Sequence, residues 1–378
     1  MKSSEVGDSI DKITAEAIEN SATSLIPKNA VLIVVRSGIL ARTVPVAMTT
    51  RPLAVNQDLK AMCPNRDVDP RYLHYFMQKS EPEILKLVTR GATVHRLSTD
   101  SLKALTFPKP PFPEQQRIIA TLDEAFAGLA TATANAQKNL GNARELFENY
   151  TNTTVSQSGD GWIEKPLSEL IEVAHGFAFD GKHFIEGDGE YPLLLTPGNF
   201  SETGALVFNE RNTKRFKGRV PAQFALNEGD LVIVMTDLSS KMKILGKPAF
   251  VDRSGILHNQ RIGRVAFKSK DILASYLYYF FRTAHFTNHI KDTATGTMVK
   301  HTAPKRILSS VICYPNTVSA QRKITLVLGA LEAAVENLES QYRKRILDIS
   351  ELRQSLLQRA FSGQLTSPPS QAIKEAAE

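Results

Sequence analysis

The spacing of apolar side chains predicts two unusually long helices that pair with each other. In two stretches, apolar or small residues recur at alternating steps of four and three positions, which is typical of a coiled coil. The first seam consists of Leu122, Phe126, Leu129, Thr133, Ala136, Leu140, Ala143, Phe147 and Tyr150. The second seam consists of Ile324, Leu328, Leu331, Val335, Leu338, Tyr342, Arg345, Ile349, Leu352, Leu356 and Arg359. At 1.5 Å per residue the helices would be about 55 Å and about 65 Å long, and such rods usually act as spacers.

The long helices belong to an internal repeat that covers most of the chain. Segments of the first half recur in the second half in the same order. The matched segments are 31–37 with 231–237, 56–57 with 259–260, 72–76 with 276–280, 91–95 with 296–300, and 116–117 with 321–322. The last three pairs are offset by 204 or 205 positions, so a single insertion or deletion of one residue accounts for the difference in offset over this span. The chain therefore contains two copies of one unit.

Each copy has the element order of an α+β domain. A strand-rich part comes first, and short helices follow, one of which begins near Asp69 and Pro70. After a basic loop, we expect an apolar strand at 104–107 in the first copy and at 310–314 in the second. A turn containing proline then leads into the long helix. This order of elements does not fit a doubly wound sheet.

The two copies differ in length ahead of their first matched strand. Residues 162–230 precede that strand in the second copy, whereas only residues 1–30 precede it in the first. We therefore expect the first domain to be shortened at its N-terminal side. The expected divisions are a first domain at 1–112, a first long helix at 113–153, a linker at 154–161, a second domain at 162–315, a second long helix at 316–363 and a flexible tail at 364–378.

Composition and charge narrow the class of protein. The chain has 378 residues, of which 42% are hydrophobic and 22% charged, as in globular proteins. Cys63 and Cys313 stand alone, which indicates neither a disulfide framework nor a zinc site. The start lacks the apolar core of a signal peptide and no apolar run is long enough for a membrane span, so we expect a cytoplasmic protein without a membrane partner. The net charge of +7 is compatible with a nucleic acid as partner.

Catalytic and metal-binding motifs are missing from the sequence. There is no phosphate-binding P-loop and no dinucleotide-binding glycine fingerprint. His285 and His289 lie one helical turn apart, as zinc ligands do, but no third ligand lies near them in the sequence, and solvated positions are the better interpretation. We expect a protein that is not an enzyme and that binds no metal or cofactor.

Polar and basic loops at equivalent places in the two copies are candidates for DNA contact. The loops at 91–96 and 296–301 each begin with glycine, which lets a backbone approach a ligand, and each contains threonine and basic residues that suit phosphate or guanine. A helix cap with solvated charges is the alternative. Amides near 56–57 and 259–260 could read adenine, but a structural role in a turn is the better interpretation. The candidate DNA-binding residues are Arg36, Thr93, His95, Arg96, Lys214, Arg215, Lys217, Arg219, Lys241, Lys243, Gln260, Arg261, Thr297, Lys300 and His301.

The order and duplication of these segments resemble the specificity subunit of type I restriction-modification systems. The segments that carry the resemblance are 31–38, 56–60, 91–98, 112–118 and 352–363. The resemblance implies a non-catalytic subunit with two target-recognition domains, each of which reads one half of a split, asymmetric site in double-stranded DNA. It also implies that the long helices pack antiparallel, set the gap between the half-sites, and dock two methyltransferase subunits. Restriction and translocation subunits would join that core, and S-adenosylmethionine, ATP and magnesium would be bound by the partners.

Two other functions remain open from the residues alone. One is a coiled-coil scaffold whose twin domains bind proteins, and the other is an enzyme whose site the motifs do not reveal. A steep loss of DNA affinity with salt separates DNA binding from the scaffold, because each phosphate contact releases counterions.

Overall fold

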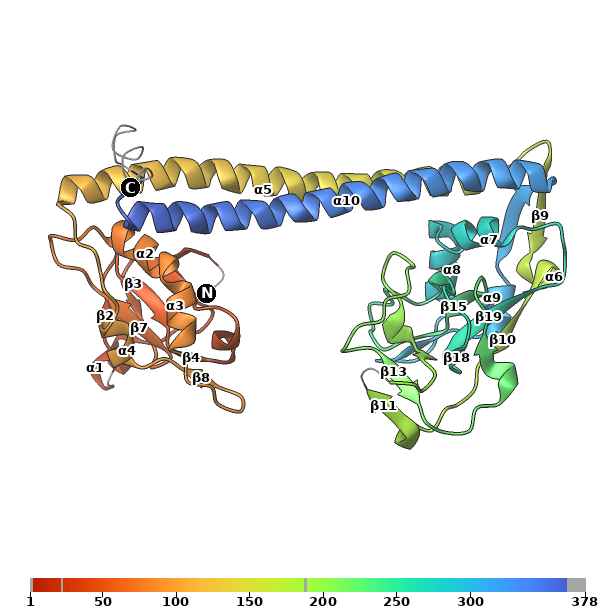
Figure 1. Ribbon diagram of the computed structural model, residues 1–378, viewed down its shortest axis with the longest axis horizontal. Helices are drawn as coiled ribbons and strands as arrows, with labels where there is room; N and C mark the ends of the chain where they lie inside the picture. Colours follow the sequence, from red (N-terminus) through yellow and green to blue (C-terminus); the bar gives the residue numbers. More distant parts are fainter. Residues whose placement is uncertain (1–2, 22, 187–188, 366–378) are drawn as a thin grey trace. The chain divides into compact units, whose positions relative to one another are not determined.

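The computed structural model describes residues 3–21, 23–186 and 189–365 (Figure 1). The expected tail at 364–378 lies outside the described residues from 366 onward. The chain divides into two compact units: unit 1 contains Met1–Asn139 and Gln341–Glu378, and unit 2 contains Leu140–Ser340. In the described part of the chain, every helix is too short or too polar to cross a membrane.

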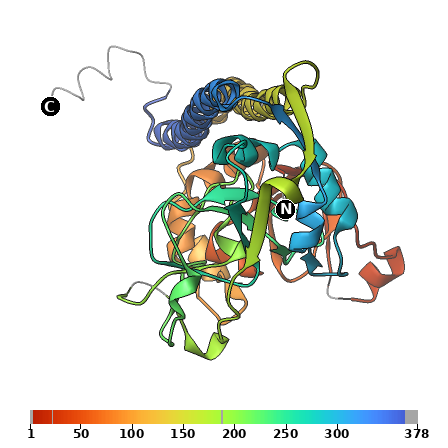
Figure 2. The ribbon, with the colours of Figure 1, turned by 90° about the vertical axis from the view of Figure 1, so that its right-hand side faces the viewer.

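Two helices of 44 residues each, α5 (Phe112–Val155) and α10 (Val318–Phe361), contribute one end to each unit. They lie side by side in both ribbon views (Figures 1 and 2). In unit 1 the guanidinium of Arg353 lies 4.6 Å from the ring centre of Phe126, and the amide of Asn139 donates to the hydroxyl of Tyr342. Residue numbers thus rise along one helix as they fall along the other, so the helices are antiparallel. The α+β class with two long paired helices is confirmed.

The prediction that every position of the second seam is packed is wrong for several positions after Val335. Leu338 and Leu352 are 37% and 48% exposed, and Arg345 and Arg359 are exposed as well. The covered positions of α10 instead include Val335, Ile346 and Leu357, which lie eleven residues apart. A straight helix has 3.6 residues per turn, so a strict seven-residue pattern drifts by about 20° per heptad. Toward the end of α10 the packed face therefore includes residues one position after those that the strict seven-residue pattern predicts.

Most of the other predicted seam residues lie on the packed face, but Tyr150, at the end of the first seam, is 42% exposed. Leu122, Phe147 and Leu328 are buried. The half-buried ones are Phe126, Leu129, Leu140, Ile324, Leu331, Ile349 and Leu356.

Unit 1 is built on a four-stranded sheet with the order β1 (Glu5–Val6), β5 (Val46–Thr49), β3 (Val31–Val34) and β7 (Leu59–Met62). The central strand β3 is buried along its whole length, as its unbroken run of Val, Leu and Ile predicts. The other elements are α1 (Ala15–Glu19), β2 (Leu25–Ile26), β4 (Arg36–Ser37), the 3₁₀ helix η1 (Gly38–Ala41), β6 (Leu53–Ala54), α2 (Pro70–Lys79), α3 (Glu81–Lys86), β8 (His95–Arg96) and α4 (Thr99–Lys103).

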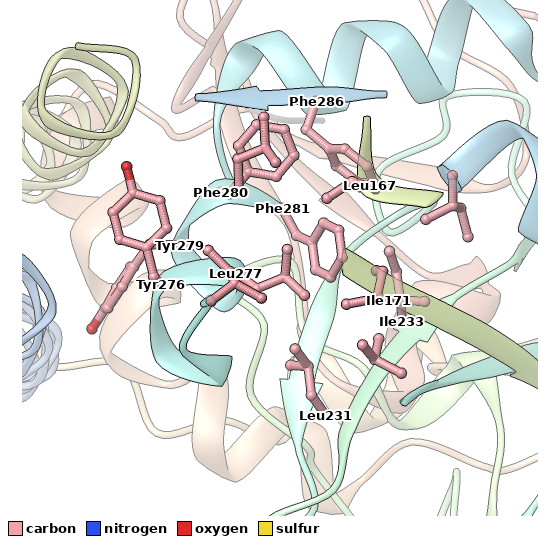
Figure 3. Close-up of a cluster of buried hydrophobic side chains, with 14 of the residues drawn as sticks. Leu167, Ile171, Leu231, Ile233, Tyr276, Leu277, Tyr279, Phe280, Phe281 and Phe286 are labelled. Atoms are coloured by element: carbon pink, nitrogen blue, oxygen red, sulfur yellow. The ribbon is translucent and has the colours of Figure 1, made fainter. Parts of the chain in front are cut away.

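Unit 2 has a four-stranded sheet with the order β10 (Ile171–His175), β19 (Ile262–Phe267), β15 (Leu231–Val234) and β17 (Pro248–Phe250). Leu231 and Ile233 of β15 pack with Tyr276 and Leu277 of α7 (Ala274–Phe280) in its core (Figure 3). The other strands are β9 (Trp162–Pro166), β11 (Phe184–Glu186), β12 (Leu194–Leu195), β13 (Lys214–Phe216), β14 (Ala225–Leu226), β16 (Thr236–Asp237), β18 (Ile256–His258), β20 (Lys300–His301) and β21 (Val311–Pro315). The other helices are α6 (Leu167–Leu170), η2 (Gly181–His183), η3 (Pro197–Asn199), η4 (Ala222–Phe224), α8 (Ala284–Thr293) and α9 (Pro304–Leu308).

The strand expected at 104–107 does not form. Its counterpart in unit 2 is β21, which pairs along its whole length with β9. In the described part of unit 1 no strand pairs with 104–107, and an isolated extended segment gains no ladder hydrogen bonds. Leu105 and Phe107 instead pack against the core of unit 1.

A buried glutamine connects each long helix to the segment that precedes the short helix packed beside it. In unit 2, Gln321 donates to the carbonyls of Asp271 and Pro315 and accepts from the amide of Leu273. In unit 1, Gln115 donates to the carbonyls of residues 67 and 110 and accepts from the amide of residue 69. The sequence comparison matched Gln116 with Gln321, whereas the structure gives this role to Gln115, 206 positions before Gln321.

Candidate nucleic-acid interface

Three of the candidate residues of unit 1 lie on a two-stranded ribbon. Strand β4 pairs antiparallel with β8, so that Arg36 lies opposite Arg96 and Ser37 lies opposite His95. The ribbon lies on the side of unit 1 that faces away from α5 (Figure 1). The backbone of β3 continues into β4, so a buried core strand fixes the position of Arg36.

The loop that carries Thr93 and His95 is closed by a double hydrogen bond between the backbones of Thr89 and Arg96, at 2.8 and 3.0 Å. A Cβ added at Gly91 would collide with the carbonyl oxygen of Val94, so the tight loop requires glycine there. Thr93 and Arg96 are exposed, which leaves their polar groups available to a ligand.

Unit 2 repeats this ribbon and loop. Strand β16 pairs with β20, with Thr236 opposite His301 and Asp237 opposite Lys300. Thr295 and His301 form the same double backbone hydrogen bond, at 3.0 and 2.9 Å. Gly296 has a φ of 97°, in the left-handed region that favours glycine. The loop at 296–301 thus presents Thr297, Lys300 and His301 as the first loop presents its own residues.

An asparagine turn lies next to each ribbon. The Asn259 side chain accepts from the backbone amide of Arg261 at 3.0 Å, and Asn56 accepts from that of Asp58 at 3.1 Å. These amides are occupied by the turn, in line with the structural interpretation of the sequence. In unit 2 the turn presents the exposed Gln260 and Arg261 beside the ribbon.

Lys241 and Lys243 lie on the loop that follows β16. The carboxylate of Asp237 shapes this loop, since it accepts from the backbone amides of Ser239 and Ile244 at 2.8 and 2.9 Å. Lys243 forms an ion pair with Glu202 at 2.6 Å, and both side chains are more than half exposed. An exposed pair of this kind contributes little to stability, so a phosphate can replace Glu202 at low cost.

The cluster of Lys214, Arg215, Lys217 and Arg219 lies apart, on and after β13, which pairs with β11 in a separate two-stranded sheet. The amino groups of Lys214 and Lys217 lie 5.7 and 5.9 Å from the ring centres of Phe184 and Tyr191. Arg215 donates to the carbonyl of Tyr191 at 2.6 Å. The last of the four, Arg219, is exposed. The structure therefore does not join this cluster to the ribbon of β16 and β20.

Two further side chains, which were not among the predicted site residues, lie among these groups. Thr236 lies opposite His301 in the second ribbon, and the repeat itself could have found it, because 231–237 matches 31–37 and Thr236 then corresponds to Arg36. Phe177 is 37% exposed and exchanges backbone hydrogen bonds with His258 and Gln260, which puts an aromatic ring beside the turn. A lone phenylalanine in a loop gives no sequence signal.

The histidines weighed as zinc ligands have other roles. His285 and His289 hydrogen-bond through Nε2 to the backbone carbonyls of Val311 and Arg306, at 3.1 and 2.8 Å. Across the residues that the structure describes, no three His, Cys, Asp or Glu side chains come close enough together to hold a metal ion. Burial lowers the pKa of His258, beneath the turn, below its usual range.

Comparisons with known proteins agree on one family. The model of the type I restriction modification DNA specificity domain matches residues 2–140. The chain is 32% identical over 146 residues to the specificity subunit of the type I restriction enzyme EcoR124I/EcoR124II of Escherichia coli, a match that spans 38% of this chain and 36% of that protein. It is 23% identical over 374 residues to the MjaIX specificity subunit of Methanocaldococcus jannaschii, a match that spans 93% of this chain and 81% of that protein.

Solved structures share the fold. A chain from a structure of a type I R-M system has a TM-score of 0.71 at 15% identity, covering 90% of this chain and 84% of that one. The HsdS subunit of Thermoanaerobacter tengcongensis has a TM-score of 0.51 at 14% identity, covering 90% of this chain and 82% of that one.

Proposed function

The chain belongs to the family of non-catalytic DNA specificity subunits of type I restriction-modification systems, and we propose that it reads a bipartite, asymmetric site in double-stranded DNA. Unit 1 would read one half-site through the ribbon of β4 and β8. Unit 2 would read the other through the ribbon of β16 and β20 with the turn at Gln260 and Arg261. The asymmetry of the site would follow from the different side chains that the two units present on and beside their ribbons.

The observation that carries this proposal is the occurrence of one ribbon twice with different side chains on it. The backbone pairing, the closing hydrogen bonds and the glycine are the same in both units. The facing pairs are Arg36 with Arg96 in unit 1 and Thr236 with His301 in unit 2. A fixed backbone with variable polar tips suits a surface that reads base edges and phosphates, because such contacts depend on side-chain identity.

The division into domains is part of the proposal. Residues 1–112 and 162–315 would act as target-recognition domains, 113–153 and 316–363 as spacer helices, 154–161 as a linker and 364–378 as a tail. The spacer helices would set the gap between the half-sites, and a tandem pair in one chain allows the half-sites to differ, unlike the palindromes read by symmetric dimers.

The long helices would also dock two methyltransferase subunits. Apolar side chains that α5 and α10 leave exposed would be available to such a partner. Leu146, Leu326, Val327 and Leu347 are each more than half exposed. Restriction subunits would join the complex in the cytoplasm, and S-adenosylmethionine, ATP and magnesium would be bound by the partner subunits.

Insertion of one heptad into each long helix tests the spacer role. The insertions are placed at the same level, after Asn139 in α5 and before Tyr342 in α10, because these two residues are hydrogen-bonded. Seven residues add about 10 Å of helix, which corresponds to about three base pairs. Methylome sequencing should therefore show the same half-sites with a gap about three base pairs longer. An unchanged gap in an active complex would contradict the proposal, and insertion into one helix only serves as the control that disrupts pairing.

A further inference from the structure

We propose that Arg36 and Arg96 form a clamp for a single phosphate of the DNA backbone, and that unit 2 has no equivalent clamp. The inference rests on the proposed function and specifies how unit 1 holds its half-site. Both arginines are exposed, and they lie directly opposite each other across β4 and β8.

The hydrogen-bond pattern of the ribbon brings these two side chains close together. Arg96 uses its backbone N–H and C=O to bond Thr89, and the amide of Leu97 donates to the carbonyl of Val35 at 2.8 Å. Arg36 and Arg96 are therefore a non-hydrogen-bonded pair of the antiparallel ladder. In such pairs the Cα atoms are about 4.5 Å apart and the side chains leave from the same face.

The equivalent pair in unit 2 shows how close facing side chains come at these backbone positions. His301 bonds Thr295 in the same way, and the amide of Thr302 donates to the carbonyl of Met235 at 2.9 Å. The side chains of the equivalent pair are in contact, with Thr236 Oγ1 lying 3.0 Å from His301 Nδ1. Two guanidinium groups on the same backbone positions are long enough to converge on one ligand.

The charges of the pair call for an anion. Like charges directly opposite each other in an antiparallel pair destabilise it. Asp58 compensates only in part, because its carboxylate lies 3.9 Å from Nε of Arg36 and both side chains are 43% exposed. In unit 2 the facing pair carries no arginine and forms its own hydrogen bond, so no anion is required there.

A backbone phosphate fits this pair better than a base edge. One guanine edge offers O6 and N7, which a single arginine already satisfies in a bidentate fashion. A phosphodiester offers a full negative charge and oxygens that two guanidinium groups can share, with charge-assisted hydrogen bonds from both sides. The proposal therefore assigns a positioning contact to this pair and leaves base reading in unit 1 to other side chains.

The test replaces the unit 1 pair by the unit 2 pair in the full chain, with Arg36→Thr and Arg96→His, bound to its methyltransferase subunits. Affinity is measured as a function of salt for a duplex that carries the methylated motif and for a scrambled duplex. Loss of one phosphate contact should reduce the slope of log affinity against log salt by about 0.9. We expect that change on both duplexes, an unchanged methylated motif, and a melting temperature that stays the same or rises because the repulsion is gone.

Two outcomes would overturn the clamp. An unchanged salt slope with relaxed specificity at one base pair would show that the arginines read a base. A slope and affinity that match those of the Arg42→Thr, Arg66→His variant, which removes the same charge at exposed positions outside the ribbon, would show only a general charge effect. Failure of the proposed function looks different, because the unaltered complex would then show no salt-dependent binding to either duplex.

Discussion

In each unit a short helix packs against the two long helices. The arrangement of the backbone is the same in both units, but the side chains that make the contact differ. In unit 1 the ring of Tyr75 on α2 meets Phe126 of α5 edge-on, and its hydroxyl donates to Asp123. The cation at this junction is Arg353, which comes from α10, stacks on Phe126 and donates to Gln78 of α2.

In unit 2 the cation comes from the short-helix side of the junction. Arg282 follows α7, donates to Glu332 of α10, and stacks on Phe147 of α5 at 5.1 Å. Glu332 also accepts from the hydroxyl of Tyr279 at 3.0 Å. With the offset of 206 positions, Glu332 corresponds to Phe126 and Phe147 corresponds to Arg353. A cation and an aromatic ring meet in both units, but the ring of unit 2 takes the place of the cation of unit 1, and the cation Arg282 takes the place of Gln78.

Residues that hold the backbone are the same in the two units, whereas residues that contact only other side chains differ. The retained residues connect backbone to backbone, as Gln115 and Gln321 do, or permit a tight loop, as Gly91 and Gly296 do. Side chains that contact only other side chains have been exchanged between elements. The facing pairs of the ribbons belong to the second kind, so they differ between the two units while the backbone pairing stays the same.

The largest effect is expected from the buried glutamines. Gln321→Leu leaves two backbone carbonyls and one amide without their partner, which should lower the free energy of unfolding of unit 2 by about 5 kcal/mol. Trp162, the only tryptophan of the chain, packs on the core of unit 2, so its fluorescence reports the unfolding of that unit. Gln115→Leu should leave the tryptophan transition in place.

Gln116→Leu changes an exposed position and is the control, so its stability should be nearly unchanged. If Gln116→Leu shifted the unfolding transition seen by circular dichroism as much as Gln115→Leu does, the equivalence of Gln115 and Gln321 would be refuted.

The exchanged junction of unit 2 should respond almost as strongly. Glu332→Ala leaves the largely buried Arg282 without its carboxylate, which should cost about 4 kcal/mol. The double variant replaces Arg282 by Gln and Glu332 by Phe, the residues of unit 1 at these places. Its loss of unfolding free energy should be smaller than the sum of the losses in the single variants Arg282→Gln and Glu332→Phe. The tryptophan transition in urea measures all of these variants. Additive single and double changes would mean that the two residues do not act as a pair.

A pH effect confined to unit 1 is expected from His74. Burial, helped by the nearby guanidinium groups of Arg353 and Arg71, lowers the pKa of His74 to about 4 from its ordinary value of 6.5. The unfolded chain takes up the proton first, so stability is complete above pH 6.5 and falls as the pH drops toward 4, by about 3 kcal/mol. His74→Tyr, which copies the tyrosine that unit 2 has at position 278, should remove this part of the pH dependence in urea unfolding followed by circular dichroism. An unchanged pH profile would contradict the assignment to His74.

Much of the fold follows from sequence patterns, and most of the interface does not. The period of the apolar residues predicted the paired long helices, and duplication predicted that the glycine loops would be equivalent. The strict heptad failed at Leu338 and Leu352 because a straight helix drifts against a seven-residue repeat. The expected strand at 104–107 failed because a strand depends on a partner that local sequence does not encode. The facing of Arg36 and Arg96 depends on pairing between segments about sixty positions apart, which no local spacing reveals.

Methylome sequencing of a host that expresses this chain with its methyltransferase tests the central claim most directly. If each unit reads one half-site, the methylated sequence is a two-part, asymmetric motif with a fixed unspecified gap. A single contiguous motif, or methylation that does not depend on this chain, would contradict the account.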